Sequence, residues 1–320
     1  MPQSILASMS KARVLRKCAG KPPGSRTNHG GGVLYPTVGF LLLCLMPMAF
    51  VWTSMRSLLT LVFEDETYTH IPLVPIVSFY LIYTGRKLIF SKILYAWGTG
   101  SALILPGSIS LALARLNIWQ LSSANQNSLL MIGCVLLWAG AFGLFFGNYA
   151  LRAASFPLLF LLFSIPIPQP PLSQVIFLLQ EGSAKAAESI YWMFGVPFFR
   201  QGLDFALPGV TIRVAEECSG IRSSLALLIL TVLASHLFLR NNWKKALLCL
   251  LVFPIAVAKN GLRIFTLSTL AVYVNPAFLH GRLHHQGGIV FFLVALVLMA
   301  LLLILLDKSG KKSPAADSIG

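Results

Sequence analysis

Long apolar runs separated by short clusters of Lys and Arg constrain this chain more than any other feature. A helix needs about 20 apolar residues to cross a hydrocarbon core about 30 Å thick. Eight runs have or approach that length: 33–53, 71–85, 93–114, 129–150, 153–168, 221–239, 246–272 and 286–306. Only 11% of the residues are charged, against about 25% in soluble domains. We therefore predict an all-α polytopic membrane protein with about eight transmembrane helices.

The same pattern divides the chain into one membrane domain and two tails. Residues 1–32 are basic and rich in Gly, Ser and Pro, which predicts a disordered cytoplasmic tail. The apolar stretch that begins at Val33 is too long for a signal-peptide core and lacks a cleavage site, so we interpret it as a retained first span. Residues 33–306 then form a single integral membrane domain, and 307–320 form a second cytoplasmic tail.

The basic clusters also predict the orientation. With the N-terminus in the cytoplasm, most of the 25 basic residues lie inside, together with only Asp307 and Asp317 among the ten acidic ones. Both termini are then cytoplasmic. The net charge of +15 reflects this membrane pattern, so we expect lipids and no nucleic acid as partners. The polar residues near positions 218, 263 and 284 all fall at the outer face.

The longest non-cytoplasmic stretch is 169–220. Within it, residues 172–194 are apolar with carboxylates and a lysine at helical spacing, which predicts a helix on, or partly in, the outer membrane face. Segments 195–202 and 207–214 are bounded by Gly and Pro and predict two short strands joined by turns. A small helix and hairpin insertion therefore precedes Cys218.

Cysteine usage singles out one thiol. No CxxC and no Cys/His metal spacing occurs, so neither a disulfide framework nor a metal site is indicated. Cys18 lies in the basic tail. Three cysteines lie inside apolar runs: Cys44, Cys134 and Cys249. Cys218 alone lies among charged and small polar residues. Cys218 is therefore the candidate nucleophile.

The neighbours of Cys218 support this interpretation in part. Ser219 and Gly220 precede an apolar run and predict a helix start, whose N-terminus favours a thiolate. Arg222 adds positive potential, whereas Glu217 opposes it. A working thiolate therefore needs a further cation. The alternative is that Cys218 is an ordinary interfacial cysteine.

Arg263 is the candidate for that cation. A charged residue in an apolar span is costly and usually faces a partner or a wet cavity. Asn260 lies three residues earlier on the same helical face and could orient the guanidinium. The alternatives are a snorkelling side chain or a salt bridge with Glu216 or Glu217. We expect Lys259 to be solvated or bound to lipid phosphate.

Two adjacent histidines supply a candidate proton carrier. His284 and His285 precede Gln286 and a pair of glycines at the start of the last apolar run. Apolar packing does not explain such a polar cluster, and neutral imidazole near pH 7 is a natural general base and acid. The alternative is a pair of ordinary interfacial histidines.

At these sites the sequence resembles the exosortase family of bacterial membrane cysteine transpeptidases, with the archaeosortases as relatives. The residues that carry the resemblance are Ile165–Pro168, Gly195–Pro197, Leu207–Gly209, Val214–Ser223, Asn260–Arg263 and the His-Gly element before the last span. The resemblance implies a Cys-Arg-His constellation of Cys218, Arg263 and His284. In the family the histidine stands four residues before a glycine, which selects His284, although His285 is a rival.

The resemblance also implies a substrate class and a place of action. Substrate proteins would carry a C-terminal sorting signal made of a short motif such as Pro-Glu-Pro, a transmembrane helix and a basic cluster. Cleavage would take place on the periplasmic face of the bacterial inner membrane, in systems that accompany exopolysaccharide production. No metal or organic cofactor would be needed.

Two other functions stay open at this point. One is a non-catalytic component of polysaccharide export or assembly, which would use the same polar residues to bind an anionic headgroup or a glycan. The other is a thioester acyltransferase that passes an acyl group to a lipid or sugar. The substitution Cys218→Ser separates binding from catalysis, because only catalysis needs the thiol.

Overall fold

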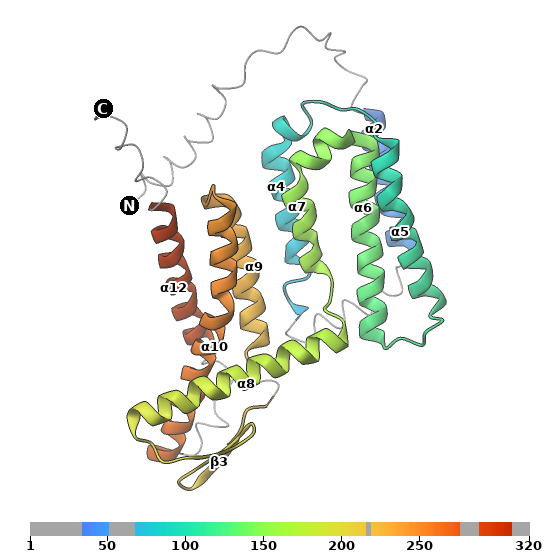
Figure 1. The fold of residues 1–320 in the computed structure, drawn as a ribbon. Coiled ribbons are helices and arrows are strands. Elements are labelled where there is room, and N and C mark those ends of the chain that lie inside the picture. The colour runs from blue at the N-terminus through green and yellow to red at the C-terminus, as the bar shows by residue number, and fades with distance from the viewer. Residues whose placement is uncertain (1–33, 51–67, 216–218, 276–287, 309–320) are drawn as a thin grey trace, which may run out of the picture.

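The computed structural model describes residues 34–50, 68–215, 219–275 and 288–308 (Figure 1). Apart from one small sheet, the described chain is helical, and a helix lies at each of the eight predicted apolar runs. These helices are α2 (Leu34–Phe50), α4 (Leu73–Ile89), α5 (Trp97–Leu116), α6 (Ser123–Ala153), α7 (Ser155–Phe160), α9 (Ile221–Phe238), α10 (Asn242–Tyr273) and α12 (Gly288–Lys308). The predicted tail at 1–32, and nearly all of that at 307–320, lies outside the described residues.

Five of these helices are long and apolar enough to cross a membrane: α5, α6, α9, α10 and α12. A sixth candidate is formed if α7 and the helix that follows it count as one bent span. The protein is therefore a multi-pass membrane protein. The count of eight spans stays a prediction, because α2 and α4 have 17 residues each and a helix of that length reaches only about 25 Å.

The run at 153–168 is not the single helix that its length suggested. The six residues of α7 are followed by a 3₁₀ helix, Leu161–Ser164, which ends before Pro166 and Pro168. Proline cannot continue a helix interior, and the chain turns by 86° into α8 (Gln169–Phe194). The helix predicted over 172–194 is confirmed, and it lies across the bundle in Figure 1.

The sheet has three strands, so the prediction of two was wrong. Strands β1 (Phe199–Gln201), β2 (Asp204–Leu207) and β3 (Val210–Arg213) form an antiparallel sheet in the order β1-β2-β3. The middle strand occupies the segment that we expected to be a connection. Two tight turns make room for it, because Gly202 and Gly209 adopt φ values of 63° and 76°, which glycine reaches at little cost.

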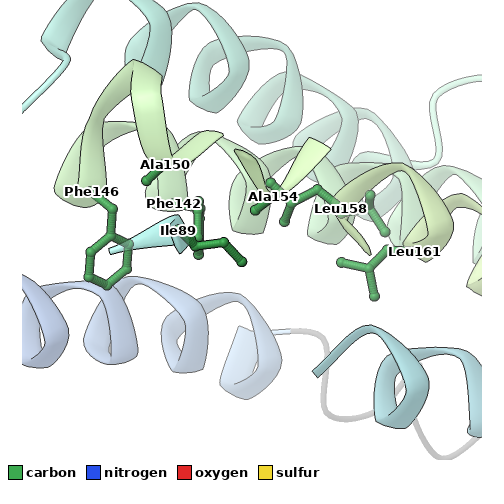
Figure 2. Packing of buried hydrophobic residues seen from close by; sticks show 8 residues of the cluster. Ile89, Phe142, Phe146, Ala150, Ala154, Leu158 and Leu161 are labelled. Atoms are coloured by element: carbon green, nitrogen blue, oxygen red, sulfur yellow. The ribbon is translucent and has the colours of Figure 1, made fainter. Parts of the chain in front are cut away.

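Two clusters of buried side chains in the apolar core join most of the helices. One cluster joins α4, α6 and α7, and Figure 2 labels some of its buried side chains: Ile89, Phe142, Phe146, Ala150, Ala154, Leu158 and Leu161. The other joins α9, α10 and α12 through residues such as Leu227, Leu248 and Met299. Helix α9 also packs on α4 and α7, so the two clusters form one body that α8 crosses at one end (Figure 1).

A candidate active site at the start of α9

Helix α9 begins at Ile221, which confirms the helix start predicted there. The residue before it, Gly220, has φ 73°, a left-handed conformation that costs other residues about 1–2 kcal/mol. Ser219 is buried, and its Oγ accepts the Ile221 N–H at 3.3 Å. The Gly220 carbonyl accepts from Ser223 Oγ at 3.0 Å and from Ser224 Oγ at 2.7 Å. These bonds fix the turn that follows the predicted nucleophile.

Asn260 of α10 connects this turn to α8. The side chain is only 1% exposed, and its Nδ2 donates to Ser183 Oγ on α8 at 3.0 Å. A Cβ added to Gly220 would lie 3.1 Å from Asn260 Oδ1, so the amide packs directly against the turn. The structure therefore brings one predicted supporting residue, Asn260, against the segment that contains another, Ser219.

The chain just before the nucleophile is held by α8 as well. Gln180 is buried, and its Nε2 donates to the Val214 carbonyl at 2.8 Å, where the chain leaves β3. Gln180 and Ser183 are three residues apart and therefore lie on the same face of α8. Helix α8 thus holds the chain directly at Val214 and, through Asn260, at Gly220.

Two cations of α10 lie at this site. Arg263 is half-buried with its Nε atom fully buried, and Lys259, one helical turn earlier, lies close enough for the two like charges to interact. Lys259 is 8% exposed, and its ammonium donates to Ser223 Oγ of α9. The expectation of a solvated or lipid-bound Lys259 is therefore wrong. Arg222, a predicted supporting residue, is exposed.

The contact between α8 and α10 depends on small residues. A Cβ added to Gly261 would lie 2.5 Å from Ala186 Cβ and 3.0 Å from the Ala187 nitrogen. A Cβ added to Gly182 would lie 3.1 Å from Val257. Because the two helices approach this closely, the neighbouring Ser183 and Asn260 come within hydrogen-bond distance.

An ion-pair cluster holds the sheet against α8. Arg200 of β1 is 13% exposed and donates to Glu188 at 2.6 Å and to Glu181 at 2.8 Å. Burial alone would lower the pKa of Arg200, but hydrogen bonds to Glu188 and Glu181 outweigh it and raise that pKa. Phe205 of the middle strand packs behind this cluster with Tyr191 of α8. Because β3 pairs with β2, the sheet that leads to the site is thereby fixed relative to α8.

The remaining predicted site residues lie outside the described residues. These are Cys218, Glu217, His284 and His285, so contact between the thiol, the guanidinium and an imidazole stays a prediction. Sequence reasoning missed Ser183, Ser223 and the burial of Lys259. Within the part of the chain that the structure describes, no group of three His, Cys, Asp or Glu residues could hold a metal ion.

Comparison with known proteins finds one family. The profile of the transmembrane exosortase family matches residues 52–301, which is more than half of the chain. No curated protein matches the chain. No solved structure matches it either.

Proposed function

Because the chain belongs to the transmembrane exosortase family, we propose that it is a membrane-embedded cysteine protease or transpeptidase that cleaves C-terminal sorting signals. Family membership implies sortase-like processing of proteins with PEP-CTERM-type signals. In the proposed reaction the Cys218 thiolate attacks the scissile carbonyl and expels the C-terminal part of the substrate. The resulting thioester is then resolved by an acceptor amine, a hydroxyl or water.

The observation that carries the proposal is the anchoring of the chain on both sides of Cys218, at Val214 and at Gly220. Gln180 holds the Val214 carbonyl before Cys218, and Asn260 packs against Gly220 after it. A nucleophile must be kept within a narrow range of positions, because a misplacement of about 1 Å can cost about a hundredfold in rate. Three helices therefore hold the described residues on either side of Cys218, and apolar packing alone needs no such polar anchors.

The proposed partners of Cys218 are Arg263 and one imidazole. A half-buried guanidinium can stabilise the oxyanion of a tetrahedral intermediate. Such electrostatic stabilisation is strongest where bulk water is excluded. His284, with His285 as the rival, would take the proton from the thiol and return it to the leaving amine. Glu217, Ser219, Arg222 and Asn260 are proposed as supporting residues.

The proposed location is the periplasmic face of the bacterial inner membrane, with both termini in the cytoplasm. The positive-inside pattern supports this orientation. The substrate would approach with its own transmembrane helix in the same membrane, so its sorting motif would meet the enzyme at the membrane surface. The acceptor molecule and the choice between transfer and hydrolysis belong to the second half of the reaction.

Co-expression with a tagged substrate tests the proposal. The substrate carries a C-terminal signal of the three-part type, and its size is followed on a gel with the wild-type protein, Cys218→Ala and Cys249→Ala. Cys249 is a half-buried cysteine of α10 and is the matched control. We expect loss of the substrate tail with wild type and Cys249→Ala but not with Cys218→Ala. Equal processing by Cys218→Ala would contradict the thiol mechanism and favour a binding or export role.

A further inference from the structure

Lys259 is a buried cation that the proposed mechanism does not use. Its side chain lies in α10 next to the second cation, Arg263, and the residue is 8% exposed. Burying an ammonium is costly, and a like charge one helical turn away adds to the cost. Charged residues inside membrane helices usually serve function. The position of Lys259 therefore calls for an explanation beyond packing.

The hydrogen bonds around Lys259 have a defined direction. An ammonium can only donate, so Lys259 donates to Ser223 Oγ. The serine hydroxyl has one proton, which it donates to the Gly220 carbonyl at 3.0 Å. The bonds therefore run from the ammonium through one hydroxyl to the turn.

Among the residues that the structure describes, the other charged groups near Lys259 are cationic or paired elsewhere; Glu216 and Glu217 lie outside the described residues. Arg263 lies on its own helix, and Arg222 at the start of α9 is exposed. On α8, the residue that faces the site is the neutral Ser183, whereas Glu181 pairs with Lys185 and Arg200. Lys259, Arg263 and the N-terminus of α9 contribute positive potential at the start of α9, and the adjacent Glu216 and Glu217 oppose it.

We propose that Lys259 is a positioning residue for the nucleophile segment, which fixes the Gly220 turn through Ser223 and keeps a second positive charge beside Arg263 at the start of α9. This inference rests on the proposed function, because the proposed function supplies the Cys218 thiolate that the charge would stabilise. We call the bonds from Lys259 through Ser223 to the Gly220 carbonyl the relay. The relay requires a cation that also donates a hydrogen bond, so arginine in Lys259→Arg should preserve the function and methionine in Lys259→Met should not.

Alkylation of Cys218 measures this effect without any substrate. The protein keeps Cys218 as its single cysteine, with the others replaced: Cys18→Ser, Cys44→Ala, Cys134→Ala and Cys249→Ala. The rate of alkylation by iodoacetamide is measured from pH 5 to 10. We expect Lys259→Met to raise the midpoint of this profile by about one pH unit, which slows alkylation at neutral pH about tenfold. Lys259→Arg should restore the wild-type midpoint.

Two further variants separate the charge from the relay. Lys245→Met removes one positive charge from the same helix, 14 residues or about 21 Å away, and should leave the midpoint unchanged. Ser223→Ala breaks the relay but keeps the charge, so it should slow substrate processing several-fold with a smaller change in midpoint than Lys259→Met. Ser223→Ala also tests the relay without removing a buried charge.

The two proposals fail in different ways. If Lys259→Met gives the same midpoint and the same processing rate as Lys245→Met, while processing still requires Cys218, only the inference about Lys259 is overturned. If Cys218→Ala processes the substrate as wild type does, the proposed function is overturned, and the role of Lys259 falls with it.

Discussion

Replacing Gly261 by alanine tests whether the site depends on close contact between α8 and α10. The new Cβ would lie 2.5 Å from Ala186 Cβ and 3.0 Å from the backbone nitrogen of Ala187. Ordinary contacts of this kind begin at about 3.4 Å, so the helices must separate by about 1 Å. Because one of the obstructing groups is backbone, a rotamer change cannot relieve the clash.

The expected cost follows from overpacking. Adding a methyl group to a tightly packed contact costs about 1–3 kcal/mol, and we expect a loss of that size in the free energy of unfolding. A separation of about 1 Å also moves Asn260 away from Ser183, and a shift of that size can lower an enzymatic rate about a hundredfold. We therefore expect a larger effect on the rate of substrate processing than on the free energy of unfolding.

Unfolding in detergent micelles and substrate processing in membranes are the two assays. Gly98→Ala is the matched control, because it lies in helix α5 and its added Cβ would meet no atom within 4 Å. That change should leave stability unchanged or raise it by about 0.5–1 kcal/mol. Wild-type stability and wild-type processing in Gly261→Ala would refute the close contact and, with it, the placement of Asn260.

Three more substitutions have defined outcomes. Gly220→Ala should lower the free energy of unfolding by about 1–2 kcal/mol because of the left-handed φ, and it should also reduce processing because its Cβ meets Asn260. Gly195→Ala is the control: its φ of 64° is similar but its Cβ would lie in open space, so it should lower stability only. Arg200→Met should cost about 1.5–3 kcal/mol and expose the sheet to limited proteolysis, whereas the exposed Arg213→Met should cost under about 1 kcal/mol. Asn260→Ala should cost about 1–3 kcal/mol, measured by unfolding, and strongly reduce processing. Equal effects of Gly220→Ala and Gly195→Ala, or of Arg200→Met and Arg213→Met, would contradict these assignments. An Asn260→Ala variant with wild-type stability and processing would do the same.

The helices could be predicted from the sequence because lipid leaves few alternatives. A chain inside a bilayer must satisfy its backbone groups within each segment, so an apolar run of sufficient length becomes a helix. The predicted run 221–239 corresponds to α9 at Ile221–Phe238 for this reason. The run at 153–168 was harder, because Pro166 and Pro168 leave room only for α7 and a 3₁₀ turn before the 86° bend.

The sheet and the polar contacts of the site were less accessible to sequence reasoning. The middle strand has only four residues between two glycine turns, so its alternation is too short to recognise. The bond from Lys259 to Ser223 joins residues 36 positions apart, and it depends on how α10 is rotated against α9. Ser183 carries no signal at all in the sequence, because a small polar residue is common on any helix.

The central claim is that Cys218 carries the substrate as a thioester, and trapping that intermediate tests it most directly. Membranes that contain enzyme and substrate are quenched in acid, digested and examined by mass spectrometry. The account predicts a peptide that contains Cys218 with the N-terminal part of the cleaved substrate attached, and release of the adduct by neutral hydroxylamine. Accumulation of cleaved substrate with no adduct on Cys218, or with an adduct on another residue, would contradict it.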